Sequence, residues 1–574
     1  MYKCENCGAE LRFDPKEQML ICDYCTSKIS VSEYEKKAAR NIKSAKEETI
    51  SGQEAEFYQS PEMPSSKEEY ERIFKEAEPL KEAPQKTFKA FVCTCPSCGG
   101  QLLAYEETAA TFCSFCGAGV LLESRVSEEK RPDEIIAFKI TKEQAEDEYR
   151  KLLKKSLFAP REMKKEEEIE RFRGIYMPYW VYSYHKEGPV KLAGSRSHRA
   201  GDYIVTDHFL LESQVKADFN GVSYDASSSF SDSLSEAIAP FDISQAKDFD
   251  PAYISGFYAD TSDVEKEVYS GDALFAAKQY TADMLLGTKE LQSYNVSQRE
   301  IERSVNLNEE EPRLAFFPVW FLSSRNKKDD RVSYAVVNGQ TGKAAADLPV
   351  DKKKLIIGTL LIAIPIFIIF NLVWTLTPSQ LIAFTFVFAI VSLIIANRQL
   401  NLVYTFENRI NDKGYMSKAG TQKLWNVKKK KSISFKGFIN IILIIAAVFI
   451  TAALASIDSD LASIFLVVVI VFFVLLSNKR KKKDPGNVKT KEEVAKAPFS
   501  QKIKILIKPL IAIVLGILVL MWDPVADIYY YAACIICMLL VAWSFWDILG
   551  LHNRLAQRPL PQFKKRGGEN YEKY

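Results

Sequence analysis

The strongest pattern of hydrophobic positions is a set of six apolar runs in the second half of the chain, each 16 to 20 residues long and followed by a polar loop. About 20 apolar residues form a helix that spans the hydrocarbon core, and shorter runs can rely on local thinning or on flanking side chains that snorkel. A buried core helix is the alternative for each run, but six runs in one region favour a membrane domain. We therefore predict an all-α membrane domain of six helices within residues 354–550, in the runs Leu355–Trp374, Leu381–Ala396, Phe438–Ala455, Leu461–Ser477, Ile505–Trp522 and Ile528–Trp546.

The loops between these runs differ sharply in charge. Residues 397–437, 478–504 and 551–574 carry ten, ten and six Lys or Arg, whereas the loops on the opposite side carry none. Positive loops stay in the cytosol, so this split predicts a multi-pass protein of the cell membrane with both termini cytosolic. Residues 551–574 form a basic cytosolic tail. The basic runs determine topology first, and contact with anionic lipid of the bilayer is a further role for them.

The pattern in residues 133–350 is typical of an α+β domain with mostly antiparallel strands. Thr141 to Gln144 has the capping-box sequence, which predicts a helix that continues to about Leu157. Helices are also predicted over Ser231–Ala239 and Val264–Leu286.

Two related phrases mark strands in this domain. Met177–Val181 and Phe317–Phe321 each join a proline to aromatic and β-branched residues, so we expect paired strands of one sheet. Val332–Val337 and the turn Asn338–Gly342 predict a β-hairpin, because Asn-Gly supplies the positive φ angles of a tight turn.

One cysteine pattern, C-x-x-C-G-x-x-L-x10-C-x-x-C, occurs twice near the start of the chain. Four thiolates in two C-x-x-C pairs satisfy a tetrahedral metal ion completely. We predict two small zinc ribbons, residues 1–31 and residues 91–124, joined by a charged linker over residues 32–90 that is flexible or helical. Each ribbon would hold one structural Zn²⁺, through Cys4, Cys7, Cys22 and Cys25 and through Cys95, Cys98, Cys113 and Cys116.

A disulfide framework and an iron–sulfur cluster are two other uses of cysteines in this pattern. A disulfide framework needs an oxidising compartment, and the opening residues Met1 to Cys4 contain no apolar leader that would carry the thiols there. An iron–sulfur cluster could use the same ligands, but identical spacing in both copies favours zinc. Cys93 has no counterpart in the first copy, so we do not expect it to be a ligand.

Charge argues against a nucleic-acid partner. Residues 1–350 carry 46 basic and 60 acidic side chains, whereas residues 351–574 carry 30 and 13. Binding to a phosphate backbone depends on Lys and Arg, yet the second ribbon has none between Phe91 and Ser124. A protein partner is the better expectation for the ribbons.

The chain carries no familiar catalytic signature, so we expect no enzyme. Gly339 to Lys343 differs from a phosphate-binding loop in spacing and in the residue that follows the lysine. Trp180 and Trp320 could line a ligand groove, but aromatic strands are more often core. The histidines His185, His198 and His208 could converge on a metal, but we expect isolated surface histidines. Lys508 and Asp547, near the cytosolic ends of their spans, are expected to snorkel or pair, and Cys534 with Cys537 in the last span are expected to be packing residues.

The order of these features resembles a largely uncharacterised family of bacterial multi-pass membrane proteins with zinc ribbons of the TFIIB type. The resemblance covers the chain to about Asp351. Its most specific part is the turn Asn338 to Lys343, followed by Asp347-Leu348-Pro349. It implies the architecture predicted above and no established activity.

Two functions fit these observations. The first is a non-enzymatic, membrane-anchored adaptor or sensor whose cytosolic ribbons and α+β domain bind a protein. The alternative is a transporter or channel component that uses the ribbons as a regulatory cap.

Overall fold

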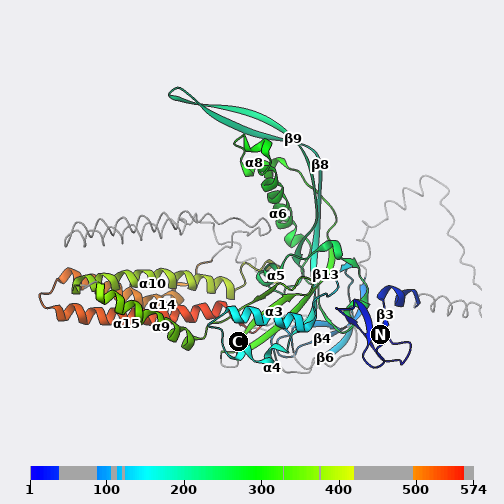
Figure 1. Cartoon of the computed structure of the whole chain (residues 1–574), viewed down its shortest axis with the longest axis horizontal. Helices are drawn as coiled ribbons and strands as arrows, with labels where there is room; N and C mark the ends of the chain where they lie inside the picture. Colours follow the sequence, from blue (N-terminus) through cyan, green and yellow to red (C-terminus); the bar gives the residue numbers. More distant parts are fainter. Residues whose placement is uncertain are drawn as a thin grey trace, which may run out of the picture.

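The computed structural model describes residues 2–37, 87–104, 113–118, 123–326, 329–373, 377–418 and 495–561. Most of the predicted linker and two of the predicted membrane runs, Phe438–Ala455 and Leu461–Ser477, lie outside the described residues. Figure 1 shows a central sheet domain from which apolar helices extend along the long axis of the molecule.

The N-terminal cysteine pattern folds as a three-stranded antiparallel sheet of β1 (Leu11–Asp14), β2 (Met19–Cys22) and β3 (Lys28–Ile29). A helical turn over residues 31–37 follows. Leu11, Phe13 and Leu20 are buried and belong to the same core as the main sheet. This small sheet is therefore packed against the rest of the protein.

The main sheet has thirteen strands, and most of its neighbouring strands are antiparallel. The path β10-β7-β13-β8-β11-β5-β4-β6 forms its body, and β9, β12, β14, β15 and β16 pair at its sides. Strands β4, β5 and β6, which flank the second cysteine pattern, belong to this sheet because β5 pairs with β11. The strands are β4 (Thr87–Thr94), β5 (Gln101–Ala104), β6 (Glu123–Lys130), β7 (Glu134–Ile135), β8 (Arg173–Ala200), β9 (Tyr203–Asp225), β10 (Lys247–Asp248), β11 (Tyr258–Asp260), β12 (Asn308–Glu309), β13 (Arg313–Asn326), β14 (Arg331–Asn338), β15 (Ala344–Ala346) and β16 (Arg558–Pro559).

The two proline-aromatic phrases pair as predicted, since Met177 on β8 lies opposite Phe317 on β13 in antiparallel register. The predicted hairpin is also confirmed as β14 and β15, but the positive φ of its turn lies at Gly342, at +78°, and not at Asn338 or Gly339 as predicted. In its turn, the Asn338 side-chain oxygen accepts hydrogen bonds from the backbone N–H groups of Gln340 and Thr341. Gly339 is required there, because a Cβ atom would lie 2.6 Å from the Phe138 ring.

Helices and short 3₁₀ segments pack on the sheet, and the predicted capping box is confirmed at the start of α3. The Gln144 side chain accepts from the Thr141 backbone N–H at 2.9 Å, and the Thr141 hydroxyl accepts in return from the Gln144 N–H at 3.4 Å. The helices and 3₁₀ segments of this part are α3 (Lys142–Lys155), η1 (Glu162–Lys164), α4 (Glu166–Ile169), α5 (Asp232–Ile238), η2 (Ile243–Gln245), η3 (Pro251–Ile254), α6 (Glu267–Leu286), α7 (Lys289–Gln292) and α8 (Gln298–Ser304).

Strands β8 and β9 form a long antiparallel arm that leaves the sheet (Figure 1). They pair from Tyr179 and Asp225 at the base to Ala200 and Tyr203 at the tip. Near the base the arm packs against α6, and further out against the segment around α8. The sequence signal for the tip is Gly201-Asp202, a two-residue turn with Gly201 at φ +64°.

The C-terminal region is helical, with three apolar helices long enough to cross a membrane among the residues described. It contains α9 (Lys352–Val373), α10 (Pro378–Glu407), the short α11 (Lys413–Lys418), α14 (Phe499–Trp522) and α15 (Asp527–Leu555). The candidate spans are α10, α14 and α15, whose apolar windows are only 22% to 28% buried within the protein. Side chains exposed in this way are compatible with lipid contact.

Three of the six predicted spans are therefore supported among the described residues. Two of the predicted runs are not described, and the first run forms α9, which begins with three lysines and contains Pro365, so its crossing stays a prediction. The short run Leu381–Ala396 is part of the 30-residue helix α10, because Thr377 caps that helix upstream and residues 397–407 continue it.

The sheet domain is fastened to these helices at several places. At the start of α9, the Asp351 N–H donates to the Phe158 carbonyl at 2.7 Å. After α10, the Arg409 guanidinium donates to the Ser228 carbonyl at 3.2 Å. After α15, β16 adds a strand to β14. The helices and the sheet thus form one connected body.

Candidate metal centres

The structure brings the eight predicted cysteines together in two groups of four. In each group the sulfur atoms all lie within 4.8 Å of one another. The first group is Cys4, Cys7, Cys22 and Cys25, and the second is Cys95, Cys98, Cys113 and Cys116.

Each knuckle is a tight turn closed by a backbone hydrogen bond. In the second group, the Gly99 N–H donates to the Cys95 carbonyl at 2.8 Å, and the Gly117 N–H donates to the Cys113 carbonyl at 2.9 Å. Both glycines have positive φ angles, +73° and +66°. Glycine adopts this left-handed backbone conformation without a Cβ penalty, which accounts for the glycine after the second cysteine of each pair.

The first group uses one glycine and one threonine in the corresponding places. Gly8 has a φ of +74° and Thr26 a φ of +58°, and each N–H closes its turn on the carbonyl of the first cysteine in its pair. A β-branched residue is strained in this region. The second knuckle of the first group therefore keeps a less favourable backbone than the other three.

The sulfur separations fit a tetrahedral ion. Metal–sulfur bonds of about 2.3 Å place tetrahedral sulfurs about 3.8 Å apart. In the second group Cys95 and Cys116 are 3.8 Å apart, and Cys98 and Cys113 are 3.7 Å apart. In the first group the sulfurs of the Cys4–Cys25, Cys7–Cys22 and Cys7–Cys25 pairs are closer, 3.4 to 3.5 Å apart. All greatly exceed the disulfide bond length of about 2.05 Å, and all eleven cysteines are free thiols.

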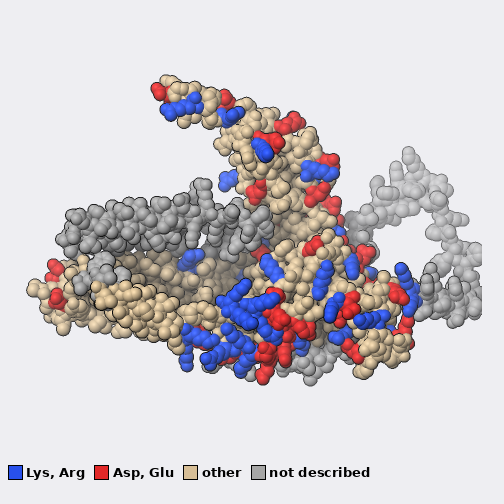
Figure 2. All heavy atoms as spheres, in the orientation of Figure 1, with Lys and Arg blue, Asp and Glu red and all other residues tan. Residues whose placement is uncertain are grey.

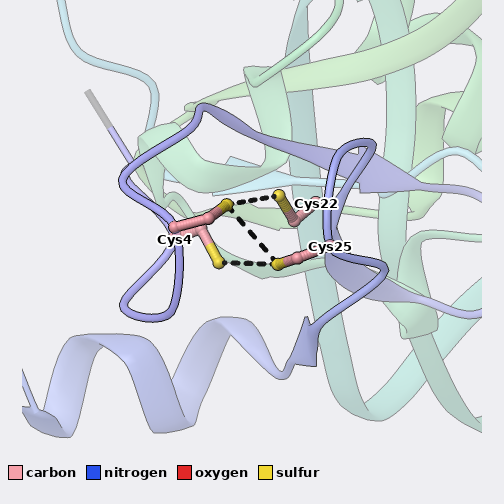
Figure 3. Close-up of side chains that lie close together, drawn as sticks. Cys4, Cys22 and Cys25 are labelled. Carbon is pink, nitrogen blue, oxygen red and sulfur yellow. Dashed lines mark hydrogen bonds between the residues drawn. The ribbon is translucent and has the colours of Figure 1, made fainter.

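Figure 3 shows how the first group is assembled, with the side chains of Cys4, Cys22 and Cys25 converging from opposite loops of the small sheet. Hydrogen bonds favour the thiolate at some of these cysteines and the thiol at others. The Ser27 hydroxyl, 3.0 Å from the sulfur, lowers the pKa of Cys25 to about 6, and the thiol of Cys113 is the largest cause that lowers the pKa of Cys116 to about 7. Hydrogen bonds between neighbouring thiols raise the pKa of Cys98 and of Cys113. Thiolate is the form that binds metal.

The two groups differ in burial. All four cysteines of the second group are buried in one core cluster with Phe317 and Val319 of β13. The Tyr334 hydroxyl donates to the carbonyl of Phe115, within the second knuckle, at 2.7 Å. The four thiols converge on one position, and apolar side chains enclose them. This group therefore leaves no coordination position open to a substrate.

The first group lies at the surface but its sheet is anchored below. The Phe13 N–H donates to the Ser255 carbonyl at 3.1 Å, and the Tyr2 hydroxyl donates to Asp250 at 2.9 Å. On the outer side Cys7 is exposed, and the neighbouring Tyr24 is 85% exposed. The first ribbon therefore exposes a cysteine knuckle and the aromatic ring of Tyr24 to solvent.

The remaining sequence candidates are placed as follows. Cys93 is buried beside the second group but is not among its four thiols. Trp180 and Trp320 are core residues whose indole N–H groups donate to the carbonyls of Val264 and Ile140.

The three histidines are spread along the arm. His185 pairs with Asp218, His198 lies 3.5 Å from Asp207, and His208 is opposite Ser195. They do not converge on a metal.

Within α15, Cys537 donates to the Ala512 carbonyl of α14, and Cys534 is likewise buried. These thiols have a packing role. Lys508 and Asp547 form an ion pair between the same two helices.

Sequence reasoning missed a group of buried carboxyls where the chain after α10 meets the sheet domain. Asp225 ends β9, Asp232 begins α5 and Asp412 precedes α11. Asp232 accepts hydrogen bonds from the Tyr269 hydroxyl and the Lys413 N–H, and Asp412 pairs with Arg409 at 2.9 Å. Burial is the largest cause that raises the pKa of all three, to about 7 for Asp232. Their separation in sequence gave no signal.

Comparisons with known proteins give one informative match. No model of a known protein family matches the chain. The chain is 31% identical over 248 residues to the uncharacterised protein YdjG of Bacillus subtilis (strain 168), and the match covers 42% of this chain and 69% of YdjG. No solved structure matches it.

Proposed function

This chain belongs to the family of the Bacillus subtilis protein YdjG, and we propose that it is a non-enzymatic, membrane-anchored adaptor or sensor that binds a protein partner. Each group of four cysteines would hold one structural Zn²⁺, and α10, α14 and α15 would cross the cell membrane. The sheet domain and both termini would be cytosolic. The proposed partners are the lipid bilayer and a protein, with no role for nucleic acid.

The charge at the two ends of the helices supports this orientation. Lys502 and Lys504 lie at the start of α14 and Arg554 at the end of α15, whereas residues 377–380 and 523–527 at the far ends carry no Lys or Arg. In Figure 2 basic side chains gather where the helices meet the sheet domain, beside acidic ones, and most of the helical region is uncharged. Positively charged flanks favour the cytosolic side.

One observation carries the adaptor proposal: the single strand β14 contacts both the second cysteine group and the end of the last membrane helix. Its Tyr334 donates to the Phe115 carbonyl in the knuckle at 2.7 Å. Three residues earlier on the same strand, its Arg331 donates to the carbonyls of Arg554 and Gln557 at 3.1 Å each. Strand β16, just after α15, adds to the same strand.

This contact gives the metal-organised part a direct connection to the helices. Arg331 also lies 3.0 Å from Glu407 at the end of α10, and that carboxylate lies 2.7 Å from Arg554. The Arg331 and Glu407 side chains are only 15% and 20% exposed, so water screens this pair less than at an open surface, whereas Arg554 is exposed. A displacement of the helix ends would therefore be transmitted to β14 through these hydrogen bonds and ion pairs.

The first ribbon is the better partner-binding surface of the two. Its Tyr24 is 85% exposed, whereas the second group is enclosed in the core. Exposed tyrosine suits protein contacts because it combines an apolar ring with a hydroxyl and loses little side-chain entropy.

Cross-linking and purification of the full-length protein from its native membranes would test the adaptor function. We expect Tyr24→Ala to lose the partner that wild type retains, with two metal ions per chain unchanged. Leu157→Ala, at another site that is 76% exposed, is the matched control and keeps the partner. An identical set of partners in Tyr24→Ala and wild type would overturn the role of the first ribbon.

A second function, as a transporter or channel component, is favoured by polar groups inside the helical region. Lys508 of α14 and Asp547 of α15 are 2.6 Å apart, and Ser544 is fully buried nearby in sequence. Ionisable residues within membrane helices often mark ion pathways. Reconstituted protein that carries an ion flux abolished by Asp547→Asn would support this function, and absence of flux above that of empty vesicles would remove it.

A further inference from the structure

The tip of the β8–β9 arm exposes an unusual number of apolar side chains. Every residue from 196 to 210 is exposed. Tyr203 and Ile204 are each 78% exposed, Leu210 is 74% exposed, and Val205 and Phe209 are each 39% exposed, with the Phe209 ring packed against Tyr294 at 5.2 Å between ring centroids. Contiguous exposed apolar side chains of this kind mark an interaction site.

The arm is braced only as far as this tip. Ser195 and Asn295 exchange two backbone hydrogen bonds, of 3.2 and 2.6 Å, which hold the segment between α7 and α8 against the arm. Just below, Leu192 and Val296 are buried in one cluster. Because Ser195 lies opposite His208, the arm is supported up to these two residues, and residues 196–207 form an exposed hairpin beyond them.

The direction of the tip identifies the surface that it meets. In Figure 1 the arm rises from the sheet beside α6 and α8 and then bends, so that its tip points along the long axis in the same direction as α10, α14 and α15. If those helices cross the membrane, the tip points towards the leaflet on the sheet side.

The composition of the tip fits the lipid interface. Arg199 lies opposite Ile204 across the hairpin, Arg196 lies opposite Asp207, and Asp202 is in the turn. A tip of this kind can bury the apolar side chains of Tyr203, Ile204 and Val205 at the acyl boundary, while its charged groups stay at the level of the lipid headgroups. Tyr203, at the turn, has the amphipathic ring that is enriched at membrane interfaces.

The backbone limits how deep the tip can enter. A two-stranded hairpin has unpaired N–H and C=O groups along its outer edges, which are costly in the hydrocarbon core. The tip is therefore suited to the headgroup level and not to a full crossing.

We propose that residues 196–207 form a membrane-interface anchor that binds phospholipid of the leaflet facing the sheet domain. This inference rests on the proposed placement of the helices in the membrane. The anchor would hold the sheet domain at a second point, away from the helices themselves.

Photo-cross-linking of the full-length protein in vesicles of phosphatidylethanolamine and phosphatidylglycerol tests the anchor. A benzophenone amino acid would replace Ile204, and adducts would be identified by mass spectrometry. Ile535 on α15, 60% exposed, is the lipid-facing control, and Tyr24, 85% exposed on the first ribbon, is the solvent-facing control. We expect at least a fivefold higher yield of phospholipid adduct from position 204 than from position 24.

The controls distinguish the possible failures. A yield at 204 no higher than at 24, with adducts at 535, overturns the anchor and leaves the membrane placement standing. A protein adduct at 204 also overturns it, in favour of a protein contact. Absence of lipid adducts at 535 overturns both the membrane placement and the anchor.

Discussion

The ammonium group of Lys508 on α14 lies 2.6 Å from a carboxylate oxygen of Asp547 on α15. The same ammonium stacks over the ring of Trp543, 4.0 Å from its centroid. Both charged side chains are mostly buried, with 17% and 23% of their surface exposed. The pair therefore joins two candidate membrane helices by a charge contact in an apolar setting.

This relationship predicts that the two charges depend on each other. Asp547→Leu would leave the lysine without its counter-ion, and we expect it to destabilise the protein by about 3 kcal/mol. The double variant Lys508→Met with Asp547→Leu should regain most of that loss. Thermal unfolding of the full-length protein in nanodiscs measures both. Equal destabilisation by the single and double variants would contradict the pairing.

Thr26 provides a second prediction, for the first ribbon. Its φ of +58° is strained for a β-branched residue, whereas glycine occupies the same place in the other three knuckles. Thr26→Gly relieves the backbone strain of the folded ribbon, which stabilises it, but it also gives the unfolded chain more conformational freedom, which opposes folding. We expect the relief of strain to be larger, so that the first ribbon is stabilised by up to about 1 kcal/mol. Competition with a metal chelator measures the change as slower loss of metal. Gly8→Thr, which introduces the same strain, should lose metal faster.

Removal of a cysteine ligand should affect the main sheet differently in the two groups. Cys98→Ser and Cys7→Ser are each expected to reduce the metal content from two ions per chain to one. Only Cys98→Ser should also weaken the main sheet, because Cys98 is buried in the cluster of β13 whereas Cys7 is exposed. Elemental analysis with hydrogen exchange of β4 to β6 measures both effects. Similar loss of sheet protection in both variants would contradict the assignment.

The buried carboxyls predict a dependence on pH. Free aspartates ionise near pH 3.9, whereas burial raises the pKa of Asp232 to about 7 and that of Asp225 above its usual range. Between these values the folded chain binds more protons than the unfolded chain, so stability from this group is greatest at low pH and is lost as the pH rises through about 7. Melting temperatures of full-length protein from pH 5 to pH 8 measure the trend.

A matched pair of variants isolates the carboxyls from the rest of the chain. Asp225→Asn should flatten this fall in stability, because the amide has no proton to lose. Asp202→Asn, at the exposed arm tip, should leave the slope unchanged. A slope unaffected by Asp225→Asn would assign the pH dependence to other groups.

Much of the fold could be predicted from local patterns. The capping box at Thr141, the hairpin at Asn338 and the pairing of Met177 with Phe317 each depend on residues close in sequence or on two matching phrases. The cysteine groups were also predictable, because metal ligation by C-x-x-C pairs depends on spacing alone. Such signals do not require knowledge of the tertiary structure.

The remainder depends on contacts between distant segments. The sequence suggested separate ribbons, but β5 pairs with β11, some 150 residues later, and draws the second cysteine group into the main sheet. The bonds from Arg331 to the end of α15, across more than 200 residues, had no local signature. The length of the arm also went unpredicted, although Gly201-Asp202 marks its turn. Of the six predicted spans, three are supported among the described residues, two lie outside those residues, and the first forms α9, whose crossing stays a prediction.

Site-specific cross-linking at Tyr24 in intact cells tests the central claim most directly. With a photo-reactive amino acid at position 24 of the full-length protein, the account predicts one discrete protein adduct that is lost when Cys22→Ser removes a ligand of the first ribbon. The same substitution at Leu157 should give no such adduct. Absence of a protein adduct at position 24, or the same adduct from position 157, would contradict a partner-binding role for the first ribbon.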